Sequence, residues 1–374
     1  MKVTCKRAEL LAACQGVASC VEPSAAKLNP TLANIKLVAD ARDDGFVIMA
    51  ADKEVGVRIE MSGIEIQQNG DGLILASKLL NILRECTDES VTIHVRDDAT
   101  IISTGGSRYK LATEDAAKFP NVHTFGDEDY NTVDSSVLKR LLPRASICLG
   151  KIDDDKCIAT GMLFAFDSGT LRLVSCDGKR VSYCFGNATV RRDSKDSFPS
   201  IVPTKAVRIL DKLLPLASSV QIALGSNDAA FKVGPATIRS RLLAGKFIKY
   251  QKTFSMPTDL AIEIDGGFFA SKVRQAAIMT DAISQKINFD IQAGVVEMTA
   301  ADAIGSGCVE MPIPDYTGIE YLTAFDPSLL TDALRFADGN VTLKIGGNTL
   351  AILEISEDFQ YFLAQMNPSK SQSS

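Results

Sequence analysis

The chain has 374 residues, 46% of them hydrophobic and 23% charged, with a formal net charge of −6. This composition is typical of a folded protein and excludes wholesale disorder, while the length predicts two or three domains. The acidic balance excludes a protein that coats itself in nucleic acid, because nonspecific DNA affinity comes mainly from Lys and Arg, so any DNA contact should be local and weak.

The beginning of the chain lacks the pattern of a secretory signal. Residues 1–7 turn polar before an apolar stretch can develop, and no run in the chain reaches the roughly 18 apolar residues that a membrane span needs. We therefore expect a cytoplasmic protein with no membrane partner.

The cysteines and histidines argue against metal or nucleophilic chemistry. Nine cysteines lie between Cys5 and Cys308 without a C-x-x-C pair, which favours reduced, mostly buried thiols. With only His94 and His123 available, a His-based triad or a multi-histidine metal site is poorly supported. We expect neither a metal nor a cofactor.

Three aspartates mark an internal repeat. Asp52, Asp177 and Asp302 each follow an apolar, strand-like segment, and their separations are equal (177 − 52 = 125 and 302 − 177 = 125). Equal spacing of one landmark indicates three copies of one domain. We place the domains at residues 1–125, 126–256 and 257–368, followed by a polar tail, expected to be disordered, at 369–374.

Each copy is expected to open with an amphipathic helix, at about residues 6–21, 135–150 and 265–280. In the middle helix, basic side chains fall within about 40° of one another on a helical projection, and apolar side chains lie opposite. The basic residues are Arg140, Arg144 and Lys151, and the apolar ones are Leu138, Leu142, Ala145 and Leu149. This stripe is either a solvated face or a binding face, and Pro143 weakens the angular argument.

A second helix is expected in each copy, beginning near Lys78, Lys205 and Ser328. These positions follow the repeated aspartates by similar intervals (78 − 52 = 26, 205 − 177 = 28 and 328 − 302 = 26). Ser77 and Thr204 are candidate N-caps. A strand with period-two apolar residues comes next in every copy, at about residues 91–95, 220–224 and 341–345. The pattern predicts α+β domains with antiparallel sheets, in an open array or a closed ring.

Three short motifs stand out, at residues 240–250, 107–111 and 177–180 (SRLLAGKFIKY, SRYKL and DGKR). They resemble motifs of the bacterial sliding clamp family, the β subunits of DNA polymerase III. Residues 240–247 (SRLLAGKF) with Tyr250 are similar to the family's S-R-L-x-x-G-x-F-P-x-Y signature, although Ile248 replaces the proline. Residues 107–111 (SRYKL) and 177–180 (DGKR) resemble further family elements. The resemblance covers about residues 1–366.

The resemblance implies a crescent of three clamp-type domains, each with two helices packed on antiparallel sheets, that closes into a ring as a dimer. The function implied is a processivity factor that encircles double-stranded DNA without sequence preference and has no active site of its own. The implied partners are the replicative polymerase, the clamp loader and other proteins with a clamp-binding motif. Arg140, Arg144 and Lys151 would then face DNA.

The resemblance also implies a partner-peptide groove between the second and third domains and a head-to-tail dimer contact. The dimer contact would involve Tyr109 and Leu111 in the first domain with Ile278 and Met279 in the third, although the latter two could instead be core residues. The groove positions are Ala159, Cys176, Gly178, Lys179, Arg180, Val181, Ile248, Lys252, Thr253, Asp326, Leu329, Thr349, Ala351, Phe362, Ala364 and Met366.

The sequence departs from the family at its end. Where the family usually finishes with a run like M-P-M-R-L, this chain has residues 364–368 (AQMNP) and then the polar tail. Smaller or more polar side chains bury less apolar area, so the preference of the groove is expected to differ.

Two other classes of function compete with this reading. In an enzyme, Asp153, Asp154 and Asp155, or the three repeated aspartates, would hold a metal, but consecutive aspartates point in different directions and repeated ones should lie far apart. We interpret them as turn residues. A repeat scaffold that binds only proteins is the second alternative, and the net charge of −6 mildly favours it.

Overall fold

The computed structural model describes residues 1–21, 29–42, 45–96, 99–126, 129–150, 160–191, 200–254, 257–281, 285–347 and 350–368. The chain forms two compact units. The first comprises Met1–Lys139, Phe166–Gly169 and Ala188–Ala244, and the second comprises Arg140–Ala165, Thr170–Asn187 and Gly245–Ser374.

The first unit contains two antiparallel sheets, in the strand orders β5-β1-β7-β8-β9 and β10-β15-β16-β17-β4-β3-β2-β6. Its helices are α1 (Arg7–Ala18), α2 (Ala76–Glu85) and α4 (Thr204–Leu213), with short 3-10 turns η2 (Pro30–Ala33), η3 (Ala116–Lys118) and η5 (Leu214–Leu216). Its strands are β1 (Lys2–Lys6), β2 (Asn34–Asp40), β3 (Gly45–Ala51), β4 (Val55–Met61), β5 (Glu65–Gln68), β6 (Gly70–Leu75), β7 (Ser90–Val95), β8 (Ala99–Thr104), β9 (Ser107–Ala112), β10 (Asn131–Asp134), β14 (Ser200–Pro203), β15 (Ser219–Leu224), β16 (Asp228–Val233) and β17 (Ala236–Arg241).

Two further sheets lie mainly in the second unit, in the strand orders β14-β11-β12-β13-β25-β24-β23-β18 and β21-β20-β19-β22, although the edge strand β14 is part of the first unit. Helix α3 (Ser135–Ala145) begins in the first unit and ends in the second, where η4 (Ser146–Cys148), α5 (Gln251–Phe254), α6 (Gly266–Ala277) and α7 (Pro327–Leu334) follow. The strands are β11 (Gly161–Asp167), β12 (Thr170–Cys176), β13 (Arg180–Asn187), β18 (Leu260–Asp265), β19 (Ile287–Gln292), β20 (Gly294–Ala301), β21 (Ser306–Ile313), β22 (Tyr321–Phe325), β23 (Asn340–Gly346), β24 (Leu350–Ser356) and β25 (Phe359–Ala364).

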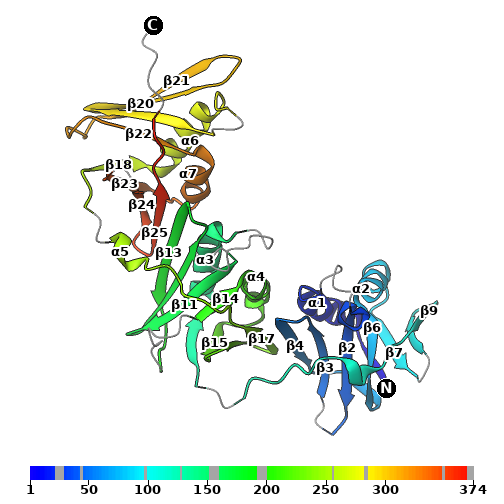
Figure 1. Ribbon diagram of the computed structural model, residues 1–374. Coiled ribbons are helices and arrows are strands. Elements are labelled where there is room, and N and C mark those ends of the chain that lie inside the picture. Colours follow the sequence, from blue (N-terminus) through cyan, green and yellow to red (C-terminus); the bar gives the residue numbers. More distant parts are fainter. Residues whose placement is uncertain are drawn as a thin grey trace. The chain divides into compact units, whose positions relative to one another are not determined.

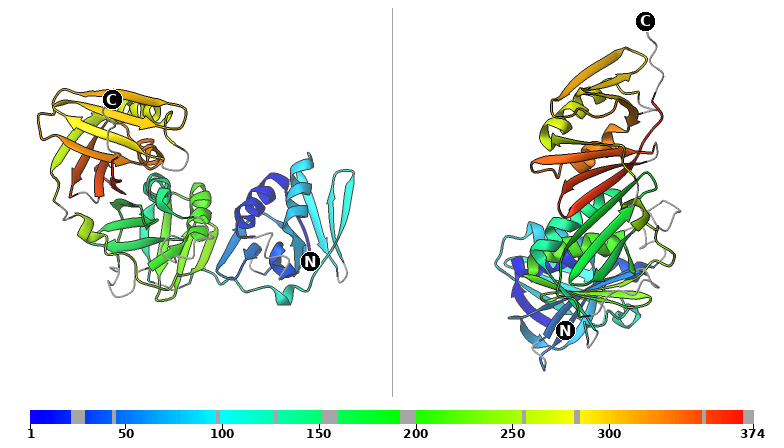
Figure 2. Two further views of the ribbon diagram at one scale, coloured as in Figure 1. Left: turned by 45° about the horizontal axis from the view of Figure 1, so that its top comes forward. Right: turned by 90° about the vertical axis from the view of Figure 1, so that its left-hand side faces the viewer.

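Paired helices cover the sheets, as expected for α+β domains with two helices each. Helix α1 packs against α2, and the two lie side by side on one face of the first unit (Figures 1 and 2). Helix α6 likewise packs against α7 in the second unit. Buried apolar side chains on these helices, such as Leu10, Leu83 and Leu330, form the cores beneath them. The predicted α+β fold with antiparallel sheets is confirmed.

The three repeated aspartates build the same turn. The Oδ1 atom of Asp52 accepts hydrogen bonds from the backbone N–H groups two and three residues ahead, at 2.7 and 2.6 Å. Asp177 does so at 3.0 and 3.1 Å, and Asp302 at 2.8 and 2.9 Å. Each aspartate therefore acts as a turn residue at the entrance of a strand.

The predicted N-caps are wrong. Helix α2 is preceded by Leu75 and α4 by Pro203, and neither of these residues makes a side-chain cap. Both helices start directly where a strand ends, so Ser77 and Thr204 already lie in the first turn. Two helices of the third copy do have side-chain caps, because Asp265 accepts from Phe268 N and Asp326 from Ser328 N.

The thiols follow the expectation of buried, reduced cysteine. Of the eight cysteines in the described part of the chain, Cys308 is exposed and the other seven are buried without a disulfide. Burial raises the pKa of the Cys184 thiol to about 12, which keeps it protonated and unreactive near neutral pH. Among the described helices, none is long and apolar enough to cross a membrane.

Candidate functional site

The basic side of α3 meets a carboxylate. Its apolar side is buried as predicted at Leu138, Leu142 and Ala145, which are at most 1% exposed. The helix ends at Ala145, however, so the predicted apolar residue Leu149 lies beyond it and is only half-buried. On the other side, Arg140 Nε lies 2.8 Å from Oδ2 of Asp358, and Arg144 Nη1 lies 2.8 Å from Oδ1 of the same residue. Arg140 and Arg144, the two residues of the basic stripe that the structure describes, therefore share the carboxylate of Asp358.

An apolar cluster lies beside the second repeated aspartate. Leu163, Val174 and Tyr250 are buried, and partly buried side chains pack against them. The Tyr183 and Tyr250 rings lie 5.9 Å apart between centroids. The partly buried members are Val181, Tyr183, Phe247 and Ile248. We call these seven residues the β13 cluster; its partly exposed members offer apolar contact to a ligand.

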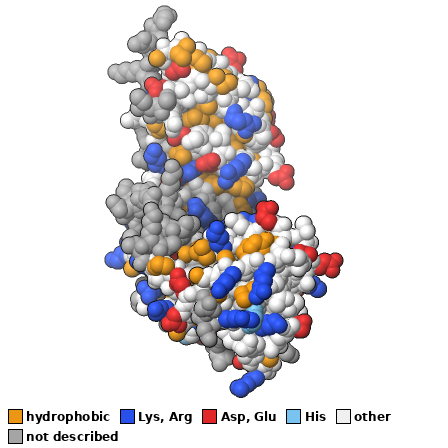
Figure 3. All heavy atoms as spheres, turned by 90° about the vertical axis from the view of Figure 1, so that its right-hand side faces the viewer, with side chains coloured by type: hydrophobic (Ala, Val, Ile, Leu, Met, Phe, Trp, Pro, Cys, Tyr) orange, Lys and Arg blue, Asp and Glu red, His pale blue; other side chains and the backbone are white. Residues whose placement is uncertain are grey.

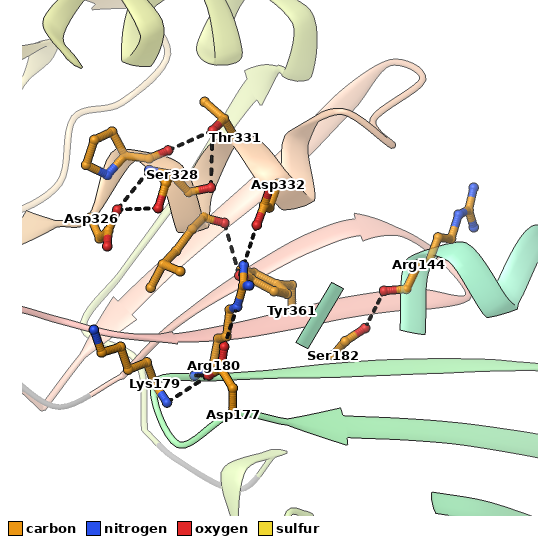
Figure 4. A network of polar contacts seen from close by, with 12 residues as sticks. Arg144, Asp177, Lys179, Arg180, Ser182, Asp326, Ser328, Thr331, Asp332 and Tyr361 are labelled. Carbon is orange, nitrogen blue, oxygen red and sulfur yellow. Dashed lines mark hydrogen bonds and ion pairs between the residues drawn. The ribbon is translucent and has the colours of Figure 1, made fainter. Parts of the chain in front are cut away.

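Arg180 joins the turn before β13 to helix α7. Its Nε donates to Oδ2 of Asp177 at 2.8 Å, and its Nη1 donates to Oδ2 of Asp332 at 2.7 Å and to the Tyr361 hydroxyl at 3.2 Å (Figure 4). The Tyr361 hydroxyl in turn donates to the carbonyl oxygen of Leu329 at 3.0 Å. These contacts raise the pKa of Arg180 despite its burial, so the side chain is a permanently charged strut.

Arg180 begins β13, and the next residue, Val181, belongs to the β13 cluster on the other face of the strand. Strand β13 pairs with β25 in antiparallel register, with Val181 opposite Phe362, so backbone hydrogen bonds fix the position of β13. The half-buried apolar side chains of the β13 cluster suit the apolar anchors of an extended peptide. In the described part of the chain, no group of three His, Cys, Asp or Glu side chains could hold a metal.

Two family models of known proteins match the first and middle parts of the chain. The family model of the DNA polymerase III beta subunit N-terminal domain matches residues 1–123, and the model of its central domain matches residues 132–249. The chain belongs to the β sliding clamp family. A curated β sliding clamp from Pseudomonas putida is 27% identical over 336 residues, which is 89% of this chain and 90% of that one.

Solved clamp structures share the fold over almost the whole chain. The DNA polymerase III subunit beta of Pseudomonas aeruginosa has a TM-score of 0.90 at 25% identity and covers 98% of this chain and 100% of its own. A sliding clamp of the same organism bound to griselimycin has a TM-score of 0.88 at 26% identity, with the same coverage of both chains. The clamp fold expected from the sequence is therefore confirmed.

The predicted groove positions fall into three groups. Val181, Ile248 and Leu329 are half-buried on or beside the β13 cluster, and Gly178, Lys179 and Lys252 are exposed near it. Cys176, Ala351 and Phe362 are buried, so they offer no exposed surface to a ligand within this chain. Ala364 and Met366 are half-buried at the end of β25. Ala159, Thr349 and the side chain of Thr253 lie outside the described residues, as do Lys151 and Asp153, Asp154 and Asp155.

Sequence reasoning gave no role to several residues that shape this surface. Asp332 and Tyr361 hold Arg180, and Asp358 holds Arg140 and Arg144. No local pattern distinguishes these three residues from their neighbours in α7, in β25 and in the turn before β25. Asp326, predicted as a groove residue, is the N-cap of α7. Asp177, in contrast, was predicted as a turn residue from the repeat, and its side chain also holds Arg180.

The unusual C-terminal run is anchored by a glutamine. Gln365 Nε2 donates to the carbonyl oxygens of Gly346 and Leu350 at 3.2 and 3.0 Å, and its Oε1 accepts from the Thr323 hydroxyl at 2.8 Å. Met366 forms an isolated bridge with Ala324. Polar contacts therefore fix the position at which the family usually has proline.

The predicted dimer residues lie on an edge strand and at the end of a helix. Tyr109 and Leu111 are half-buried on β9, which ends its sheet. Ile278 is 75% exposed directly after α6, so it is not a core residue of the chain, and Met279 is half-buried against the β20–β21 hairpin, close to Gly307. Ile304, at the turn of this hairpin, is 93% exposed.

Proposed function

We propose that two copies of this chain form a head-to-tail ring that surrounds duplex DNA and tethers the replicative polymerase and other proteins to it. The observation that carries this proposal is a strand pairing that occurs twice within the chain, whereas the third equivalent strand lies at the edge of its sheet. We call each such pairing a junction. Strand β4, which follows the Asp52 turn, pairs with β17, and strand β13, which follows the Asp177 turn, pairs with β25. Strand β21, which follows the Asp302 turn, is the edge of its sheet, and β9 is the edge of another.

The repeat specifies how the free edges would pair. The two internal junctions match Val55 with Ser240 and Arg180 with Leu363. The residue equivalent to Arg180 in the third copy is Gly305 (180 + 125 = 305). Ser240 lies four residues after the start of β17, and the corresponding residue of β9 is Leu111. We therefore place Gly305 opposite Leu111 of the partner subunit, with exposed Ile278 and Ile304 covered in the contact.

Charge on the two edges supports the same pairing. Arg108 and Lys110 are exposed on β9, and Lys and Arg side chains gather around a histidine on the face shown in Figure 3. Burial, followed by the charges of Arg96 and Lys2, lowers the pKa of His94. On the other edge, Glu297 and Glu310 face each other across β20 and β21. Opposite charge on two edges steers association and fixes register.

The remaining surfaces suit the tethering function. Helix α3 offers Arg140 toward phosphates, and contacts of this kind carry no sequence information. The β13 cluster and Arg180 would receive the apolar anchors of partner peptides, including those of polymerase and clamp loader. We infer an accessory subunit of the cytoplasm without an active site, built of domains at 1–125, 126–256 and 257–368. The aspartates considered for a metal-dependent enzyme form turns at 52, 177 and 302, which speaks against that alternative.

A topological experiment tests the proposal. The protein is loaded onto a nicked circular plasmid by its cognate clamp loader with ATP and separated from free protein by gel filtration. A ring remains with the circle and is released when a restriction enzyme linearises it. Equal retention on circular and linear DNA, or no retention on either, would favour a scaffold that binds only proteins.

A further inference from the structure

Asp358 is placed to control the charge of the helix that would face DNA. It sits in the turn between β24 and β25, in the third copy, whereas its partners Arg140 and Arg144 come from α3 in the second. Each of its two oxygens lies 2.8 Å from one guanidinium group. Its Oδ1 also accepts from the Ser356 hydroxyl at 2.7 Å, and its carbonyl oxygen accepts from Phe185 N at 3.1 Å.

The two arginines are held to different degrees. Arg144 is 15% exposed, and its guanidinium also lies over the Phe359 ring, 5.8 Å from the centroid. The backbone carbonyl of Arg144 accepts from the Ser182 hydroxyl at 2.9 Å (Figure 4). Arg140 meets Asp358 through Nε and keeps 49% of its side chain exposed. Arg140 can therefore reach a phosphate, whereas Arg144 is part of the packed structure.

A shared carboxylate changes what this helix offers to DNA. Two guanidinium charges and one carboxylate leave a net charge of about +1, so a phosphate gains less than it would from two free arginines. A phosphate on Arg140 must also compete with a fixed carboxylate. Fewer counterions are then released on binding, and the dependence of affinity on salt becomes shallower.

We propose that Asp358 is a positioning residue that holds Arg144 in the structure, orients Arg140 and weakens the grip of this helix on DNA, so that a ring can slide. This inference rests on the proposed function. It assigns the phosphate contact to Arg140 and a structural role to Arg144, which the sequence alone treats as equivalent.

The test measures binding of the full-length dimer to a labelled 30-base-pair duplex by fluorescence anisotropy, between about 50 and 200 mM salt. Asp358→Asn should raise affinity severalfold at low salt and steepen the log–log slope by up to about 0.9, the value for one phosphate contact. Arg140→Ala should flatten the slope by a similar amount. Arg144→Ala should lower the thermal unfolding midpoint, because it removes the contact with Phe359 and one partner of Asp358.

Glu354→Gln is the matched control. Glu354 lies on β24, makes an ion pair with Lys344 at 2.7 Å, and its replacement changes net charge by the same amount. Equal effects of Glu354→Gln and Asp358→Asn would mean that net charge alone matters, and would overturn the inference. So would an unchanged slope in Asp358→Asn or, if that variant does not fold, in Arg140→Ala. The two proposals can fail separately. If the wild-type protein stays on nicked circles but the variants show no change in slope, the proposed ring is supported and only the role of Asp358 is wrong.

Discussion

Arg180 donates a hydrogen bond to Asp332 at 2.7 Å and so links the start of β13 to helix α7. The same guanidinium contacts Asp177 and Tyr361, and Arg180 is only 13% exposed. A charge held by three partners from separate elements fixes the geometry of the surface around it. Arg180 is followed directly by Val181 of the β13 cluster, the candidate peptide site.

Replacing Arg180 should therefore damage both folding and peptide binding. In Arg180→Ala, Asp177 and Asp332 lose their shared cation, which should cost about 2 kcal/mol of stability. The thermal midpoint and the affinity for a labelled peptide with Leu and Phe anchors should both fall. Lys179→Ala, an exposed neighbour, is the control and should leave the midpoint unchanged. A variant as stable as the wild type would show that the strut contributes nothing.

Gln365 should prove to be a structural residue. Gln365→Pro removes side-chain hydrogen bonds to Thr323, Gly346 and Leu350, so we expect a lower unfolding midpoint even though proline is usual in the family at this position. Differential scanning calorimetry compares this variant with Gln365→Glu, which keeps the acceptor for Thr323. If the proline variant is more stable than the wild type, the anchoring role is wrong.

Ala364 should limit the affinity of the peptide site. Ala364→Met adds apolar area beside the β13 cluster, worth about 25 cal/mol per Å² buried by a ligand. A peptide with Leu and Phe anchors should bind severalfold more tightly, as measured by isothermal calorimetry. Ser356→Met, at the far end of β24, tests whether an added methionine alone raises affinity. Unchanged binding in Ala364→Met would place the peptide elsewhere.

The dimer contact should depend on the exposed residues after α6. Aspartate at both Ile278 and Met279 would bury unpaired charge in the proposed contact, so the double variant should sediment as a monomer at micromolar concentration. Leu216→Asp carries one new charge on a leucine that is 45% exposed in the central copy and should remain dimeric. A double variant that still sediments as a dimer would show that the contact is misplaced.

The Asp358 contacts should make stability depend on pH in acid. Burial alone would raise the pKa of Asp358, but the Ser356 hydroxyl and the Arg144 and Arg140 guanidinium groups hold it below its ordinary value. A carboxyl whose pKa is lower in the folded state stabilises fully above its unfolded pKa of about 3.9 and loses that contribution as pH falls through the folded value. The difference in unfolding midpoint between wild type and Asp358→Asn should therefore be largest near pH 6 and shrink below about pH 4. A constant difference from pH 3 to pH 7 would contradict this.

Local pattern determined the architecture of this protein. The equal spacing of Asp52, Asp177 and Asp302 revealed the repeat, because one turn with the same hydrogen bonds recurs in each copy. Helical and period-two spacing located the helices and strands, since both periods depend only on neighbouring residues. The buried side of α3 followed from the same periodicity, with Leu138 and Leu142 in the core.

Tertiary structure decided the partners and the exposure of the functional residues. Asp358 follows Arg144 by 214 residues, and nothing in the sequence near either residue marks them as a pair. The resemblance assigned Phe362 to the peptide groove but did not predict its burial. In the structure Phe362 is 1% exposed, on β25 where that strand pairs with β13. Helix starts at Leu75 and Pro203 were set by the strands that end there. Such features depend on contacts between distant segments, which periodicity does not encode.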